Sequence, residues 1–240
     1  YQHHGDRTLK FASFNGFTWE TVVVDEHNGT GWGASLTILP NGTPAISYGD
    51  GNEETLKYAW YDDGWQTIII DDSFSVSADG AGSSLSILHS GHPCMSYRDE
   101  TNNDIKFAWF DGDVWSNSYV DTYSTVTGNT DCAILPSGSP IISYLDNSDH
   151  ELKVSQYIGY GWEDEVVSGS RKTGAPPTAL MFLSTGQPAV CFRDATNDNL
   201  MFAWQDGLEW QKEVIESLGN SGTHVSSAIL PSGYPALTYF

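Results

Sequence analysis

Four aspartates recur at the same place in a repeated segment, and their carboxylates could bind cations or hydroxyl groups. Each has an Asn, Asp or Glu three residues later, and the pairs are Asp50/Glu53, Asp99/Asn102, Asp146/Asp149 and Asp194/Asn197. One hypothesis is a ring of oxygen ligands for calcium or for sugar hydroxyls. The other is a set of Asx turns, in which each Asp accepts hydrogen bonds from backbone N–H groups. The sequence leaves both interpretations open.

Three residues break the repeat, and we predict them as ligand-binding candidates alongside the aspartates. Trp32 lies in an expected connector, Gly29-Thr30-Gly31-Trp32-Gly33, that has no counterpart in the other copies. Its ring could pack on a sugar. Arg98 and Arg193 stand where other copies have Gly or Leu. They could bind a carboxylate or pair with the acids around them.

Two smaller departures from the repeat complete this group. Val154 and Gln156 stand where the other copies have an aromatic residue and, in most cases, a tryptophan. The pair His3–His4 lies in a loop near the beginning of the chain, and we interpret it as a solvated end rather than a metal site.

No set of residues predicts a catalytic centre. The sequence contains no G-x-S-x-G, H-E-x-x-H or P-loop motif. The carboxylates repeat like for like, whereas acid–base catalysis needs groups whose pKa values are pushed apart. We therefore favour a non-enzymatic binding module, and keep a glycoside hydrolase-like enzyme as the less favoured reading because it needs unlike acids around a channel.

One repeat supplies the elements that must position these residues. A phrase of the type I-L-P-S-G-x-P recurs every 47 to 49 residues, beginning at Ile38, Ile87, Ile134, Phe182 and Ile229. An S-Y-x-D segment, an L-K-F-A-W-like segment and a segment opened by tryptophan follow most copies. These runs are rich in β-branched and aromatic residues and are separated by Gly, Pro and Asn-Gly turns. Four short strands repeated at this period are typical of β-propeller blades.

We predict an all-β, five-bladed β-propeller with four antiparallel strands per blade, formed by one domain, 1–240. The expected blades are 35–82, 84–130, 131–177, 178–225, and a split blade of 226–240 plus 1–26. Ring closure then requires strand Ala236–Phe240 to pair with strand Leu9–Phe14. We expect the recurring tyrosines and tryptophans to pack between blades. The S-Y-x-D loops and long connectors share one end of the blades, where we expect the functional face.

The phrase S-L-x-I-L-P-S-G-x-P-x-I-S-Y-x-D…N-x-x-L-K-Y-A-W resembles repeats that are widespread in secreted bacterial and archaeal proteins. The resemblance covers essentially the whole chain. It implies a propeller fold and an extracellular or surface-exposed setting, and it implies no particular reaction.

The charge balance narrows the choice of partners. The chain has 31 acidic and 10 basic residues, a net charge of −21. This charge repels nucleic-acid backbones and anionic lipids, and no run of about 18 apolar residues predicts membrane insertion. Cys94, Cys132 and Cys191 read as small buried hydrophobes. A glycan or a protein surface therefore remains as the expected partner. We expect no required cofactor, although calcium binding stays possible, and the sequence does not predict the oligomeric state.

Repetition favours several similar sites, and several weak sites give strong adhesion. The first hypothesis is therefore a multivalent carbohydrate-binding or adhesion propeller on a secreted protein or particle surface. The alternative is a structural or protein-interaction propeller in a larger assembly.

Overall fold

The computed structural model describes residues 2–3, 7–72, 82–99, 101–123, 125–169, 178–194, 196–217 and 225–239. All regular secondary structure in these ranges is β, with 21 strands. His4, Phe240 and the connectors 73–81, 170–177 and 218–224 lie outside the described residues. No helix of membrane-spanning length and apolarity occurs in the described part of the chain.

Four complete sheets have four antiparallel strands each, paired in sequence order. Blade 1 comprises β4 (Thr30–Ile38), β5 (Pro44–Asp50), β6 (Thr55–Tyr61) and β7 (Trp65–Asp71). Blade 2 comprises β8 (Ser83–Ile87), β9 (Pro93–Asp99), β10 (Asp104–Phe110) and β11 (Trp115–Asp121). Blade 3 comprises β12 (Val126–Ile134), β13 (Pro140–Asp146), β14 (Glu151–Tyr157) and β15 (Trp162–Gly169). Blade 4 comprises β16 (Ala179–Phe182), β17 (Pro188–Asp194), β18 (Asn199–Asp206) and β19 (Glu209–Glu216).

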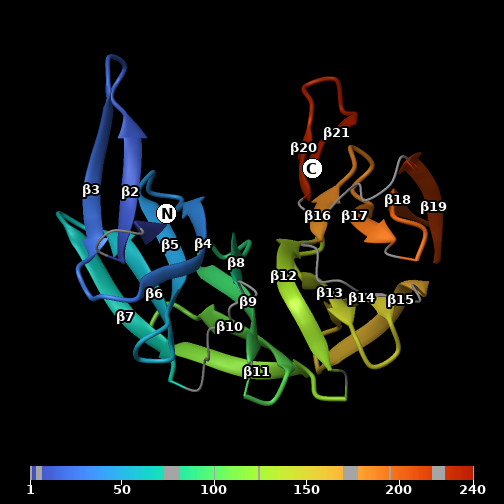
Figure 1. Ribbon diagram of the computed structural model, residues 1–240, viewed down its shortest axis with the longest axis horizontal. Coiled ribbons are helices and arrows are strands. Elements are labelled where there is room, and N and C mark those ends of the chain that lie inside the picture. The colour runs from blue at the N-terminus through green and yellow to red at the C-terminus, as the bar shows by residue number, and fades with distance from the viewer. Residues whose placement is uncertain are drawn as a thin grey trace.

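Two partial sheets stand at the ends of this series. One contains β1 (Gln2–His3), β2 (Thr8–Phe14) and β3 (Trp19–Asp25), and the other contains β20 (Val225–Ile229) and β21 (Pro235–Tyr239). Figure 1 shows the blades following one another around an arc, with the two partial sheets at its ends. The predicted all-β propeller architecture is therefore present in the described residues, and the arc is open.

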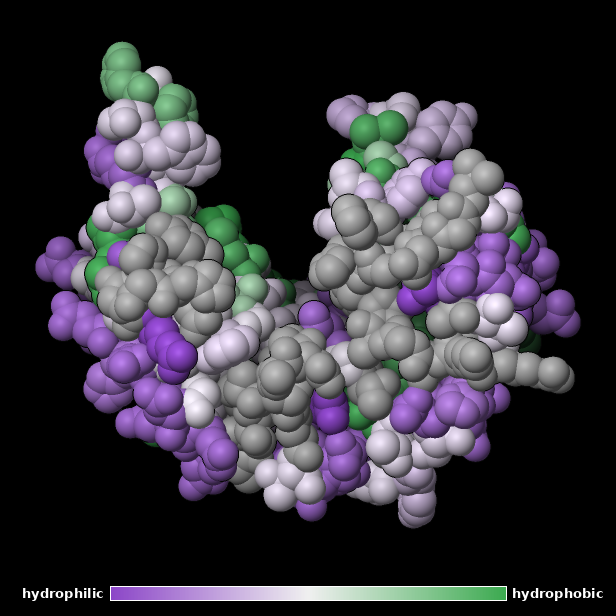
Figure 2. Space-filling view, in the orientation of Figure 1, coloured by the Kyte–Doolittle hydropathy of each residue, from purple (hydrophilic) through white to green (hydrophobic). Residues whose placement is uncertain are grey.

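The expected pairing of Ala236–Phe240 with Leu9–Phe14 is absent from the described residues. β21 pairs with β20, and β2 pairs with β3 and with β1. The short strand β1 already occupies the start of the free edge of β2, because Gln2 pairs with Leu9 and His3 with Thr8. The space-filling view shows the two ends of the arc apart (Figure 2).

The first hairpin of each copy owes its shape to one glycine. Gly42, Gly91, Gly138, Gly186 and Gly233 have φ angles between +83° and +93°. In blade 1 the Gly42 amide donates to the Leu39 carbonyl, and the Leu39 amide donates to the Thr43 carbonyl. A residue with a Cβ is strained at such φ angles, so the Gly of the repeated phrase is required by the turn.

Aromatic packing joins consecutive blades, as predicted from the repeat. The tryptophan that opens the outermost strand lies edge-on or tilted against a ring of the preceding blade. The centroid distances are 5.3 Å for Phe11–Trp65, 5.0 Å for Tyr58–Trp115 and 5.2 Å for Phe107–Trp162. The three cysteines are reduced and buried, which confirms their interpretation as small core residues.

Candidate functional site

A buried polar network repeats at the junctions between blades. At the junction of blades 1 and 2, the Tyr97 hydroxyl donates to Asp71 Oδ2 over 2.7 Å. Lys106 Nζ lies 3.0 Å from Asp71 Oδ2 and 3.1 Å from Asp99 Oδ2. Asp71 comes from blade 1 and the other three residues come from blade 2, so the network ties the blades together.

The same three side chains recur at the neighbouring junctions. Tyr48 donates to Asp25 over 2.8 Å, and Tyr144 donates to Asp121 over 2.9 Å. Lys57 and Lys153 pair with Asp50 and Asp146 of their own blades. The junction of blades 3 and 4 departs from the rule, because its corresponding residues are Ser168, Phe192 and Met201.

The four predicted aspartates take part in turns within their own blades. Asp50 Oδ1 accepts the amides of Asn52 and Glu53 at 3.0 and 3.2 Å. Asp99, Asp146 and Asp194 each accept the amide two residues later, at 3.0, 2.8 and 2.9 Å. This geometry is that of the Asx-turn alternative. Their proposed role as ligands stays a prediction.

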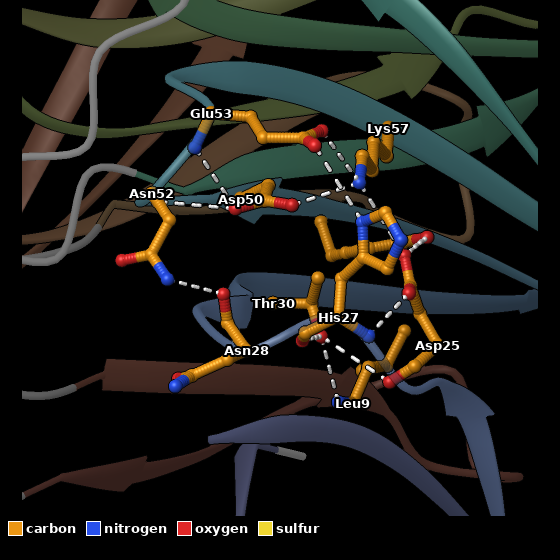
Figure 3. A network of polar contacts seen from close by, with 10 residues as sticks. Leu9, Asp25, His27, Asn28, Thr30, Asp50, Asn52, Glu53 and Lys57 are labelled. Atoms are coloured by element: carbon orange, nitrogen blue, oxygen red, sulfur yellow. Dashed lines mark hydrogen bonds and ion pairs between the residues drawn. The ribbon is translucent and has the colours of Figure 1, made fainter.

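Figure 3 shows the network between the N-terminal sheet and blade 1. His27, Asp50 and Glu53 place ligand atoms close enough together to hold a metal ion. Lys57 Nζ, however, lies 2.8 Å from Asp50 Oδ2 and 3.1 Å from Glu53 Oε2. An ammonium group therefore already pairs with both carboxylates, and a calcium ion bound there would have to displace it.

Electrostatics stabilise the charged forms in this cluster. Burial by itself raises the pKa of Asp50, but hydrogen bonds from Lys57, Glu53 and Asn52 outweigh it and lower the pKa below the ordinary value. Burial by itself lowers the pKa of Lys57, whereas its bonds to Asp50 and Glu53 raise the pKa overall. The two groups thus hold each other ionised.

Trp32 lies in strand β4, so the expectation of a connector loop at this residue is wrong. The pairing of β4 with β5 is irregular on both sides of Trp32, which faces Gly49 in the register. Gly31 and Gly33 have φ angles of +96° and +51°. These glycines, which suggested a loop, instead form the bulges of a strand. The role of Trp32 in ligand binding stays a prediction.

The two arginines bind the loops of their own blades. Arg98 is 9 % exposed and donates to Asn103 Oδ1 over 2.8 Å. Arg193 pairs with Asp198. The interpretation that these arginines pair with nearby polar and acidic groups accounts for this geometry, and their binding of an external carboxylate stays a prediction.

Sequence reasoning missed Asp131, which occupies an innermost strand. Asp131 Oδ1 accepts the Ser84 hydroxyl of blade 2, and Oδ2 accepts the Leu180 amide of blade 4, both at 2.8 Å. Desolvation raises the pKa of this carboxyl group despite these bonds. The other copies have Ser or Ala at this position. That difference is the signal that could have identified it.

Among the described residues, four cavities open at the junctions. Residues of the Pro-Ser-Gly turns line cavities A, B and D, whereas cavity C is lined by Pro188, which follows such a turn. Cavity A, between blades 1 and 2, measures about 850 Å³. Cavity B, between blades 2 and 3, measures about 480 Å³. Cavity C, between blades 3 and 4, measures about 340 Å³, and cavity D, between blade 4 and the β20–β21 sheet, about 470 Å³. These cavities therefore lie at the end opposite to the face where we expected function.

Cavity A has the composition of a small-molecule site. Tyr58 and Trp60 come from blade 1, and Phe110 and Trp115 from blade 2. Asn41, His92 and Asp113 place polar groups at the same cavity. Ligand pockets typically combine apolar and aromatic walls with a few polar groups. Cavities B and D keep the tryptophan of the third strand, as Trp109 and Trp204. Cavity C has Gln156 there.

No family model and no curated protein matches this chain. Among solved structures, AofleA from Arthrobotrys oligospora is similar, with a TM-score of 0.66 and 14% identity, covering 98% of this chain and 72% of that one. The fucose-specific lectin from Aleuria aurantia has a TM-score of 0.61 and 15% identity, covering 89% and 72%. The intramolecular trans-sialidase from Ruminococcus gnavus has a TM-score of 0.53 and 15% identity, covering 97% and 54%. At these identities the likeness shows the fold, which lectins and a sialidase share.

Proposed function

We propose that this chain is a non-enzymatic carbohydrate-binding propeller whose sugar sites are cavities A, B and D. The observation that carries the proposal is the recurrence of one arrangement between blades, in which a partly exposed tryptophan of the third strand lines a cavity. Sugar rings pack their C–H groups on such aromatic faces. The fold likeness to lectins is compatible with this function.

Polar groups at the cavity mouths supply the hydrogen bonds that sugar hydroxyls need. Cavity A offers Asn41, His92 and Asp113, and cavity D offers Thr185 and Glu213. The proposed sites need no metal, because side chains alone provide both ring packing and hydrogen bonds. Three similar sites on one chain make the module multivalent, which suits adhesion. We place it in an extracellular or surface-exposed setting on the strength of the repeat resemblance.

A glycan array followed by calorimetric titration tests this function. We expect a neutral glycan to bind with a stoichiometry above one. Trp60→Ala should remove one site while the others keep their affinity. Tyr123→Ala is the control for loss of an aromatic side chain, because Tyr123 is 98 % exposed and lines none of these cavities. Absence of binding across a broad array, or a stoichiometry that Trp60→Ala leaves unchanged, would contradict the proposal.

We further propose that the complete ring has five blades, in which β21 pairs with β2. Tyr239 donates to Glu216, which repeats the tyrosine–acid bond of the other junctions. Lys10 and Trp19 occupy the repeat positions of Lys57 and Trp65. The exposed ring of Trp19 would then pack against blade 4, as its counterparts do. The tip of the β2–β3 hairpin is apolar and open to solvent in Figure 2.

A further inference from the structure

Cavity C differs from the other three cavities in the chemistry of its walls. Gln156 replaces the tryptophan of the third strand, and Val154 replaces the aromatic residue two positions before it. The fourth strand contributes Glu163 and Glu165, which stand at the repeat positions of Gln66 and Ile68 of blade 1. The facing blade adds Gln205 and Trp210. Cavity A is lined by several aromatic side chains, whereas cavity C is lined by carboxylates and amides with one indole.

The strand register brings these groups to one face. Gln156 pairs with Glu163 and Val154 with Glu165 across the β14–β15 ladder. Residues two apart on a strand project from the same side of a sheet, so both glutamates lie on the side that faces blade 4. From that blade, Gln205 Nε2 approaches Glu165 Oε2 at 3.5 Å. Polar side chains of blade 3 and blade 4 therefore face each other across cavity C.

The negative charge of cavity C is not balanced by a positively charged residue among the described residues of its lining. Its lining contains Glu163, Asp164 and Glu165 but no Lys, Arg or His among the described residues. Asp164 accepts the hydroxyls of Tyr144 and Ser155 within blade 3. The glutamates are the acids left to face the cavity. A cationic group entering here would gain charge-assisted hydrogen bonds.

Trp210 gives the cavity an aromatic wall. It packs against the hydrophobic cluster that includes Val154, where the equivalent Trp115 and Trp162 meet a Tyr and a Phe ring. Its indole Nε1 is buried, with no hydrogen-bond partner among the described residues. At about 340 Å³ the cavity lies at the small end of the size range of ligand pockets. That volume suits one ring rather than an extended chain.

We propose that cavity C binds a sugar that carries a free amine. Glu163 and Glu165 bind the ammonium group, Gln156 and Gln205 bind hydroxyls, and the ring packs on Trp210. The proposal deepens the carbohydrate-binding function and rests on it in part. It assigns a cationic sugar to one junction, while cavities A, B and D take neutral rings.

Titration with methyl glucosaminide, followed by the NMR signal of the Trp210 indole N–H, tests the site. The signal is assigned with the Trp210→Phe variant, and the pH is kept where the amine is protonated. We expect saturable shifts of this signal, and an affinity that falls as salt is added. The N-acetyl analogue lacks the charge, and n-propylamine lacks the ring, so both should bind at least about tenfold more weakly.

The double variant Glu163→Gln/Glu165→Gln should weaken glucosaminide binding by about tenfold or more, because amides lack the charge that the ammonium needs. Glu209→Gln is the matched control, since Glu209 is exposed and does not line the cavity. Equal binding of the N-acetyl analogue or of n-propylamine, or an unchanged affinity in the double variant, would overturn the assignment.

The outcomes separate this site from the proposed function. If neutral glycans bind and methyl glucosaminide does not, cavity C is wrongly assigned and the function of cavities A, B and D stands. If methyl glucosaminide binds at Trp210 and no neutral glycan binds, the assignment of cavity C stands and the other sites fail. Circular dichroism of each variant confirms that the blades are intact before its affinity is interpreted.

Discussion

Replacing Lys106 with methionine should destabilise the propeller strongly, because it leaves two acids buried without their cation. The Lys106 side chain is about 7 % exposed and pairs with Asp71 and Asp99, which are 7 % and 0 % exposed. Removing one partner of a buried ion pair costs about 3–5 kcal/mol. For a domain of this size, that loss lowers the melting temperature by about 6–20 °C.

The junction of blades 3 and 4 provides the matched comparison within the same chain. There all three positions are changed together, to Ser168, Phe192 and Met201. Removing both Asp71 and Lys106 is less costly than removing the lysine alone, because the lysine alone leaves the Asp71 charge buried without its cation. We therefore expect the triple variant to be more stable than Lys106→Met alone, where the triple variant is Asp71→Ser, Tyr97→Phe and Lys106→Met. Asp99 keeps its turn, as Asp194 does in blade 4.

Urea unfolding followed by tryptophan fluorescence and by circular dichroism measures these differences. Lys212→Met controls for the loss of one charge, because Lys212 is exposed, and it should change the free energy of unfolding by less than about 0.5 kcal/mol. The reasoning is refuted if Lys106→Met unfolds at the same urea concentration as the parent chain. It is also refuted if the triple variant is less stable than the single one.

Three further predictions follow from described contacts. The pKa of Lys106 is raised in the folded chain. The stabilisation that Lys106 contributes is therefore complete below the ordinary lysine pKa and is lost as pH rises through the pKa of the folded state. The urea midpoint should fall at alkaline pH, and it should fall less in Lys106→Met. The pKa of Asp50 is lowered, so its stabilisation is lost as pH falls through the folded value, and Asp50→Asn should flatten the acid limb of the same titration. Ala12→Cys with Leu237→Cys should form an intramolecular disulfide if β21 pairs with β2, whereas a disulfide-linked dimer on a non-reducing gel would contradict closure by the chain's own ends.

Like-for-like repetition made the blades predictable from the sequence. Every copy has the turn glycine and the opening tryptophan, and four of the five have a tyrosine in the second strand, so the weak signals of the copies reinforce one another. The structure has four-stranded antiparallel sheets that follow the repeat, and ring contacts such as Tyr58–Trp115. Local chemistry was sufficient here because a glycine at positive φ and an alternating apolar strand act over a few residues.

Features that depend on two blades at once could not be predicted in this way. The lysine of the L-K-F-A-W segment looks like a surface charge in one copy, yet Lys57 and Lys106 are buried by acids of the preceding blade. Their recurrence in a chain with few basic residues was the available signal. Trp32 was misplaced because glycines suit both loops and bulges, and only pairing with β5 distinguishes the two.

The junction between blades 3 and 4 is unusual at both ends, and stability explains the changes at only one of them. Ser168 and Met201 lie at the S-Y-x-D end of β15 and β18, where they replace the acid and the lysine of the ion pair between blades. Gln156 and Glu163 lie at the opposite end of the β14–β15 ladder. Nothing in that exchange requires Glu163 and Glu165 at cavity C, whose lining among the described residues contains no cation. The polar wall of cavity C is therefore better explained by what it binds than by how the blades hold together.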